Sequence, residues 1–391
     1  MVTQDAADGQ SLAQDPWQWW RRQMPIIQRW AYFDHAAVAP LPAPAAAALV
    51  DFAQAASEQG DTVWPEWSAN LGRLRSGIAT WLHASPDEIA LVPNTTFGIN
   101  IVAEGLRWRE GDNVVIPGGE FPSNHFPWQN QERRGVELRV VPSPGGRVDL
   151  DGIRRAIDGR TRIVAASWVG YASGYRLPLE QLCELTHEAG ALFFLDAIQG
   201  LGVFPLDLSA TPVDFLAADG HKWMLGPEGA GVAFIRHAHL DQLDCTAVGW
   251  HSVVGGHAFD ASQFQLRDAA SRYEGGSMNM AGLIAMHESL KLFWEVGSQH
   301  GAEAIGERIL TLHAHAREAL QRNGASLISD WPEANRSGIV TFQTRGPDPA
   351  DVRNRLAEAG IAVSCRGGGI RASIHAYNTT EEIDRMAEAI R

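Results

Sequence analysis

The sequence predicts an α/β protein in two parts: a large part built on a mainly parallel seven-stranded sheet, and a smaller α+β part at the C-terminus. Two observations support this prediction. Seven short apolar runs recur between residues 88 and 235, and most of them are separated by amphipathic stretches. After about residue 260, long helical stretches replace this alternation. Strands that alternate with helices are typical of a parallel sheet that is covered on both faces.

The predicted strands of the large sheet are short apolar runs that end at polar or turn-forming residues. They lie at 88–92, 113–117, 136–141, 162–167, 191–195, 213–217 and 230–235. The segment 179–190 is typical of the helices between them, because Leu179, Leu182 and Leu185 fall on one helical face. Ligands of such sheets bind at the carboxyl ends of the strands. We therefore expect the functional residues at those ends.

The remaining segments predict two helices before the sheet and a mixed region after it. Helices are expected at 42–60, 66–83, 283–297, 302–324 and 380–391, and strands at 338–344 and 369–374. The chain of 391 residues is long enough for two domains. We expect an N-terminal arm at 1–34 that joins the small domain, a large domain at 35–262, and the small C-terminal domain at 263–391.

The composition argues against several classes of protein. A net charge of -14 disfavours a nucleic-acid partner. The sequence contains no run of about 18 apolar residues, so it predicts no membrane span. The polar, acidic N-terminus does not look like a secretion signal. The three cysteines, Cys183, Cys245 and Cys365, lie far apart. They argue against a disulfide framework and for a cytoplasmic location.

Two neighbouring strand ends carry the catalytic candidates. The apolar run at 191–195 ends at Asp196, and a carboxylate there needs a cationic partner because an unpaired buried charge is costly. The alternative is that Asp196 caps a following helix. Lys222 follows the next run and stands beside Trp223. Burial would lower the pKa of its amine and allow it to form an imine with a carbonyl compound, whereas the alternative is an ordinary surface lysine.

Two further strand ends carry residues suited to binding. Thr95 and Thr96 open a predicted helix directly after a strand, where N–H groups and the helix dipole suit a phosphate. Phe121 follows another strand, where its ring could stack on a flat ligand. An ordinary helix cap and ordinary core packing would explain these residues equally well.

Four segments together resemble the class V aminotransferase family. They are Asp196–Gln199, His221–Lys222, RYEGGS at 272–277, and RASIHAYNTTEEID at 371–384. The resemblance runs from residue 32 to the last helix. The family consists of fold type I enzymes that depend on pyridoxal 5'-phosphate (PLP). It includes cysteine desulfurases, selenocysteine lyases and isopenicillin-N epimerase-like proteins.

The resemblance implies a role for each candidate toward the cofactor. Lys222 would hold PLP as the internal aldimine, and Asp196 would bind the pyridine nitrogen, which makes the ring an electron sink. Gln199 would face the phenolic oxygen of the ring, and Phe121 would stack on it. The residues expected to hold the phosphate are Thr95, Thr96, His221 and, from the neighbouring subunit, Ser277. A homodimer with shared active sites follows from this last assignment.

The resemblance also implies where an amino acid substrate binds. Arg371 matches the arginine that grips the substrate carboxylate, a bidentate role that suits a guanidinium. We expect His35, Tyr171 and Trp250 to contact the substrate as well. No metal site is expected: His313 and His315 form an HxH pair, but residues two apart do not share a helical face.

Three departures from the family pattern bear on the reaction. Asp219 stands where relatives often have serine, and we expect it to point away from the phosphate. Trp168 and Tyr171 stand where histidine and asparagine are frequent. The segment before Arg371 is short, and Cys365 lies at a strand edge rather than within the mobile loop that carries the nucleophilic cysteine of desulfurases.

We therefore predict an enzyme that removes the α-proton of an amino acid, with Lys222 as the base and a transaminase-like or epimerase-like outcome. One alternative is β-elimination of the cysteine desulfurase or C–S lyase type. Another is a non-catalytic PLP-binding relative, which the joint presence of Lys222, Asp196 and Arg371 disfavours. A nucleotide-dependent α/β enzyme is disfavoured because no glycine-rich loop follows the first strand.

Overall fold

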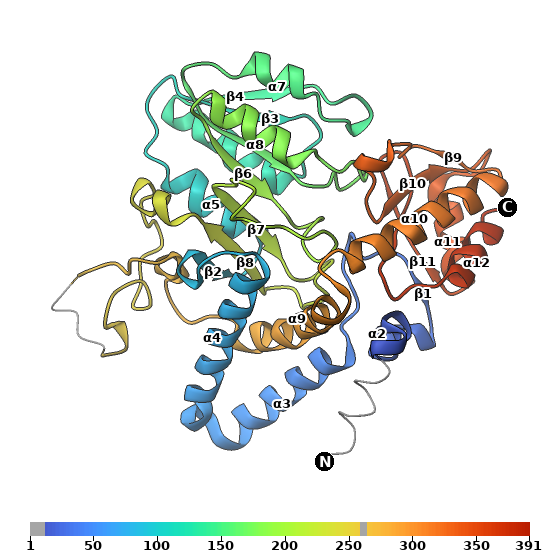
Figure 1. The fold of residues 1–391 in the computed structure, drawn as a ribbon, viewed down its shortest axis with the longest axis horizontal. Coiled ribbons are helices and arrows are strands. Elements are labelled where there is room, and N and C mark those ends of the chain that lie inside the picture. Colours follow the sequence, from blue (N-terminus) through green and yellow to red (C-terminus); the bar gives the residue numbers. More distant parts are fainter. Residues whose placement is uncertain (1–11, 259–263) are drawn as a thin grey trace.

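The computed structural model describes residues 12–258 and 264–391 and contains the predicted seven-stranded sheet (Figure 1). Its strands are β2 (Ile89–Val92), β3 (Asn113–Pro117), β4 (Glu137–Val141), β5 (Thr161–Ser167), β6 (Leu192–Asp196), β7 (Phe215–Asp219) and β8 (Gly231–Ile235). Their order in the sheet is β2-β8-β7-β6-β5-β3-β4. β8 runs antiparallel to its two neighbours, β2 and β7, and the other four strand pairs are parallel, so the prediction of a mainly parallel sheet is confirmed.

Helices cover both faces of this sheet. They are α4 (Trp64–Trp81), α5 (Thr95–Gly105), α6 (Phe126–Gln129), α7 (Leu150–Ala156), α8 (Leu179–Glu188) and α9 (Met280–His300), while α3 (Ala43–Gln59) packs on α9. Successive strand residues point to opposite faces, so Phe193 packs in the core that includes Leu182 of α8, while Phe194 packs against Trp128 of α6. Gly98 lets α5 lie close to β7, because a Cβ there would be only 2.6 Å from the Cβ of Ala217.

The C-terminal part is a second, smaller α+β assembly, as predicted. Its antiparallel sheet has the order β12-β13-β10-β9, with β9 (Ser326–Leu327), β10 (Ile339–Gln343), β12 (Ser364–Arg366) and β13 (Gly369–Ser373). The helices packed with it are α10 (Ala304–Arg322), α11 (Pro349–Glu358) and α12 (Thr380–Ala389). None of the helices in the described ranges is long and apolar enough to cross a membrane.

The N-terminal segment joins this smaller part, as Figure 1 shows for α2 (Pro16–Arg22) beside α12. Arg21 forms an ion pair with Glu382 at 2.8 Å. The strand β1 (Ala31–Tyr32) pairs in parallel with β11 (Ile361–Ala362). The boundary at 34/35 stays a prediction, while residues 1–11 and the boundary at 262/263 lie outside the described residues.

A buried ion pair fixes the segment that leads to Ser277. Glu274 ends the 3₁₀ helix η9 (Ala270–Glu274), and its side chain is fully buried. It accepts two hydrogen bonds from Arg75 of α4, at 2.6 and 3.0 Å, and a third from the backbone N–H of Leu91 in β2. One carboxylate therefore joins a helix, a strand and the loop before Ser277.

We predict that Glu274→Ala lowers the free energy of unfolding by roughly 3 kcal/mol, because it leaves a largely buried guanidinium without its anion. Urea denaturation measures this loss. The control is Asp244→Ala, which removes the exposed ion pair with Arg107 and should cost less than about 1 kcal/mol. Equal losses in the two variants would contradict the assignment.

Candidate active site

A cavity of about 380 Å³ opens at the carboxyl ends of the central strands. Parallel strands end at the same edge of a sheet, so residues that are distant in the sequence meet there. The predicted site residues that line this cavity are Thr95, Thr96, Phe121, Tyr171, Asp196, Gln199, His221, Lys222 and Arg371. The structure thus brings together nine of the candidates that the sequence suggested.

Lys222 and Asp196 supply a buried amine and a buried carboxyl on the wall of this cavity. Burial lowers the pKa of Lys222 to about 8, and the charge of Asp196 partly opposes this shift. Burial raises the pKa of Asp196 to about 6, again opposed by its neighbours. No helix follows β6. Asp196 accepts a hydrogen bond from the N–H of Ile198 at 3.2 Å within a turn, so the helix-cap alternative is wrong.

The N-terminus of α5 forms one end of the cavity. Its first-turn N–H groups lack partners within the helix, and the side chain of Asn94 caps only one of them, that of Phe97. The hydroxyl of Thr96 donates to Ser123 Oγ at 2.8 Å, and Thr95 Oγ1 accepts from the N–H of Asp219 at 2.9 Å. These donors, together with His221, fit an anionic group such as a phosphate.

Asp219 does not point away from this end, contrary to our expectation. It lines the cavity, and its Oδ2 lies 3.0 Å from Nδ1 of His221. The other carboxylate oxygen, Oδ1, is buried without a hydrogen-bond partner. The carboxylate of Asp219 thus faces the imidazole of His221 within the cavity wall.

Phe121 and Gln199 line the cavity together with Lys222. Phe121 is 42% exposed, so it is not ordinary core packing, and its ring centroid is 5.6 Å from Nζ of Lys222. Its ring also contacts Tyr171 edge-on, with centroids 5.2 Å apart. Gln199 is held by both ends of its amide, since Nε2 donates to Ala36 O and Oε1 accepts from Trp223 Nε1. A flat ligand beside Lys222 would thus meet an exposed aromatic face and a fixed amide.

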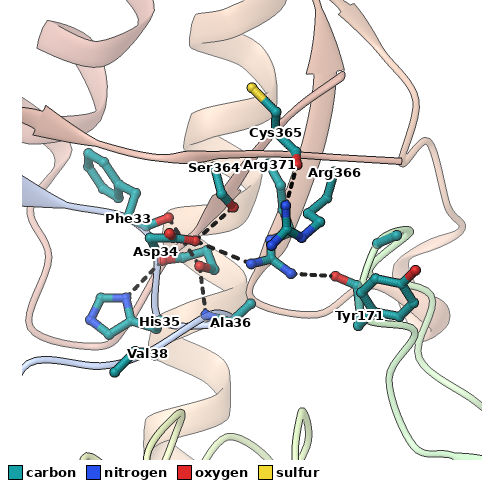
Figure 2. A network of polar contacts seen from close by, with 12 residues as sticks. Phe33, Asp34, His35, Ala36, Val38, Tyr171, Ser364, Cys365, Arg366 and Arg371 are labelled. Atoms are coloured by element: carbon teal, nitrogen blue, oxygen red, sulfur yellow. Dashed lines mark hydrogen bonds and ion pairs between the residues drawn. The ribbon is translucent and has the colours of Figure 1, made fainter. Parts of the chain in front are cut away.

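Arg371 reaches the cavity from β13, and Figure 2 shows the network that holds it. Its guanidinium donates to Asp34 Oδ1 at 3.2 Å and to the carbonyl oxygen of Tyr171 at 2.8 Å. Ser364 also donates to Asp34 Oδ1, at 2.8 Å. Burial raises the pKa of Asp34, and the charge of Arg371 counters this effect. The Nε atom of Arg371 is buried without a hydrogen-bond partner.

Comparison with known proteins agrees with this geometry. Residues 31–386 match the family profile described as aminotransferase class-V. The chain belongs to the class V aminotransferase family. The predicted family, its fold and its dependence on PLP are thereby confirmed.

Several relatives in the family cover nearly the whole chain. A probable cysteine desulfurase of Methanothermobacter thermautotrophicus is 33% identical, over 95% of this chain and 96% of its own. The isopenicillin N epimerase of Streptomyces clavuligerus is 32% identical, over 90% and 92% respectively. Among solved structures, the apo cysteine desulfurase from Thermococcus onnurineus NA1 is similar with a TM-score of 0.84 and 25% identity, over 94% of this chain and 95% of its own.

Three predicted site residues of this class V chain lie away from the cavity. His35 is completely buried, with ring nitrogens 2.8 Å from the Ser373 carbonyl oxygen and 2.7 Å from the Tyr377 hydroxyl. Burial lowers the pKa of His35 to about 4. Trp250 and the exposed Ser277 line two other hollows instead. Within one chain, these three residues are not positioned to contact a ligand beside Lys222.

Sequence reasoning missed Glu120, which lies directly behind the site. It precedes Phe121 and accepts hydrogen bonds from the N–H of Ser167 at 2.8 Å, from the Ser167 hydroxyl, and from Asn124 at 2.9 Å. Ser167 in turn pairs with Asp196 across β5 and β6. Burial raises the pKa of Glu120 to about 7. A carboxylate at a strand end was the available signal, the same one that identified Asp196.

We predict that the Lys222 amine titrates near pH 8 rather than near its ordinary value of 10.5, because burial favours the neutral form. Acetylation of the cofactor-free protein across pH, read by peptide mass spectrometry, measures this midpoint. The chain has only one other lysine, Lys291, which is an internal reference. In Asp196→Asn the midpoint should fall further, since the carboxylate raises it. A midpoint that stays near 10.5 would contradict the burial of this amine.

Proposed function

We propose that this cavity binds PLP on Lys222 and that the chain is a PLP-dependent enzyme that cleaves a bond at the β-carbon of a cysteine-type amino acid after removing its α-proton. The observation that carries the proposal is the meeting of Lys222, Asp196 and Arg371 in one cavity. The bound cofactor supplies an electron sink that weakens the bonds to the α-carbon of the substrate. The chain supplies binding groups, orientation and a base.

The residues fit the cofactor in type and position. The carboxylate of Asp196 can hold a proton on a ring nitrogen, since its own proton is lost above a pKa of about 6. Thr95, Thr96 and His221, at the positive end of α5, suit a phosphate. Phe121 would stack on a flat ring, since its own ring is 42% exposed beside Lys222. These assignments account for why charged groups of both signs converge on one cavity.

Arg371 and Lys222 would have separate roles toward the substrate: Arg371 would bind its carboxylate and Lys222 would remove its α-proton. The guanidinium, held by Asp34 and the Tyr171 carbonyl, can accept the α-carboxylate as a charge-assisted pair. Fixing the carboxylate leaves the α-proton as the group that is removed. The Lys222 amine suits its removal, because a base with a pKa of about 8 is available near neutral pH.

The names of the relatives favour elimination over transamination. The position of Cys365 then indicates how the sulfur leaves the substrate. The relatives described above are named cysteine desulfurases and an isopenicillin N epimerase. Cys365 pairs with Ile370 across β12 and β13, whereas Ser364 pairs with Arg371. Strand alternation therefore turns the Cys365 thiol away from Arg371, as Figure 2 shows. We infer that the sulfur leaves with its own substituent and is not passed to Cys365.

Epimerisation is the second candidate, and the Streptomyces relative favours it. It shares the α-proton step with elimination, but the proton then returns to the α-carbon and no bond at the β-carbon breaks. A panel of L-cysteine, L-cystine, S-substituted cysteines and both enantiomers of alanine distinguishes the two. Pyruvate and ammonia from the cysteine compounds support elimination, whereas inversion at the α-carbon without these products supports epimerisation.

We also propose a cytoplasmic homodimer. Ser277 is exposed and lies apart from the cavity of its own chain, which fits a residue that serves the phosphate site of a second copy. Trp250 lines the same hollow and could reach a substrate only by the same route. The three cysteines are unpaired, which agrees with a reducing compartment.

We predict that Lys222→Ala lowers the exchange of the substrate α-proton with solvent deuterium by at least about 10³-fold, because the general base is lost. Nuclear magnetic resonance of the substrate in deuterated buffer measures the exchange. Lys291→Ala is the matched control, since it removes the only other lysine and should leave exchange unchanged. Undiminished exchange in Lys222→Ala would show that another group removes the proton.

We predict that Cys365→Ser changes the rate of sulfur release from cysteine compounds by less than about twofold, because its thiol lies on the face opposite Arg371. Sulfide and pyruvate are measured together in the presence of a thiol reductant. A loss of sulfide release, with a persulfide on Cys365 of the wild-type protein, would restore the desulfurase mechanism with a protein nucleophile.

A further inference from the structure

The hairpin that carries Arg371 also presents a second arginine to the cavity. Arg366 ends β12 and is joined to β13 by a turn of two residues, Gly367 and Gly368, with φ angles of 62° and 78°. Two positive φ angles in a two-residue loop give a tight hairpin that favours glycine. Gln343 of β10 donates to the Gly368 carbonyl oxygen at 2.8 Å and holds the turn from the side. The hairpin is therefore short, and the hydrogen bond from Gln343 fixes its turn.

The register of this hairpin places both arginines on one face. Ser364 is opposite Arg371, and Arg366 is opposite Gly369. Residues two apart on a strand share a face, so Ser364, Arg366 and Arg371 face the cavity together. Arg366 lines that cavity, and Figure 2 shows it beside Arg371.

The two guanidinium groups differ in their partners. Arg371 is paired with Asp34, as described above. Arg366 is exposed and donates to the carbonyl oxygen of Cys365 at 2.8 Å, but within residues 12–258 and 264–391 it forms no ion pair. Its positive charge also acts on the site: it opposes the rise that burial causes in the pKa of Asp34, and it adds to the lowering that burial causes in the pKa of Lys222 and of Arg371. Arg366 is thus a cation on the cavity wall that no carboxylate of the described residues neutralises at ion-pair distance.

We propose that Arg366 binds a second anionic group at the far end of the substrate side chain. This inference rests on the proposed function, in which Arg371 takes the α-carboxylate. The phosphate donors come from α5 and from the turn after β7, not from this hairpin, so they leave Arg366 unassigned. The substrate class is then a cysteine-type amino acid whose sulfur substituent ends in a carboxylate or a group of similar charge.

A pair of compounds that differ only in this charge tests the proposal on the PLP-loaded enzyme. S-carboxymethyl-L-cysteine ends in a carboxylate, and S-carbamoylmethyl-L-cysteine ends in the neutral amide. We expect kcat/KM to favour the acid by about tenfold, the size of one charge-assisted hydrogen bond at a partly exposed site. In Arg366→Gln this preference should disappear. The exposed Arg353 of α11 offers the matched control, and Arg353→Gln should retain the preference.

Charge reversal separates recognition from structural damage. Arg366→Glu should lose activity toward the acid but gain activity toward S-(2-aminoethyl)-L-cysteine, which ends in a cation. Equal losses for all three compounds, or a wild-type enzyme that treats acid and amide alike, would overturn the proposal.

Binding measured by calorimetry distinguishes a failure of the proposed reaction from a failure of the anion site at Arg366. If the wild-type enzyme turns over none of the compounds, the proposed reaction fails. A dissociation constant that still favours the acid, and no longer does so in Arg366→Gln, would nevertheless support the anion site. Equal dissociation constants for acid and amide would refute the anion site whether or not products form.

Discussion

The site depends on one electrostatic constraint: a buried amine and a buried carboxyl that share a cavity at the edge of a parallel sheet. Burial disfavours the charged form of both residues: it lowers the pKa of the Lys222 amine and raises the pKa of the Asp196 carboxyl. Each charge makes the other less costly. The result is an amine that is partly neutral near physiological pH and a carboxylate that stays ionised above pH 6, which are the two states that the proposed chemistry requires.

The sheet topology makes this pairing possible, and the smaller C-terminal part completes it. β6 and β7 are neighbours, so their carboxyl ends deliver Asp196 and Lys222 to one place. β13 adds Arg371 from the other side, held in position by Asp34. In the proposed function, the cofactor would therefore be held by groups at the edge of the large sheet, and the substrate carboxylate by Arg371 of the small one.

Much of the fold and part of the site could be predicted from the sequence, for physical reasons. Apolar runs that stop at polar residues identify strands together with their functional ends, which is why Asp196 and Lys222 were found. The placement of His35 could not be predicted, because its burial against Tyr377 depends on packing between segments more than 300 residues apart. The orientation of Asp219 was misjudged because the sequence does not show that its carboxylate lies 3.0 Å from Nδ1 of His221. Glu120 was overlooked because the segment was interpreted through the neighbouring aromatic residue, Phe121, alone.

Reduction of the PLP-loaded protein with borohydride, followed by peptide mass spectrometry, shows directly which amine holds the cofactor. The chain contains two lysines, so the result has few possible forms. We expect a phosphopyridoxyl group on Lys222, with Lys291 unmodified. A protein that carries the label on Lys291 or the N-terminal amine instead, or that takes up no cofactor at all, would contradict this expectation.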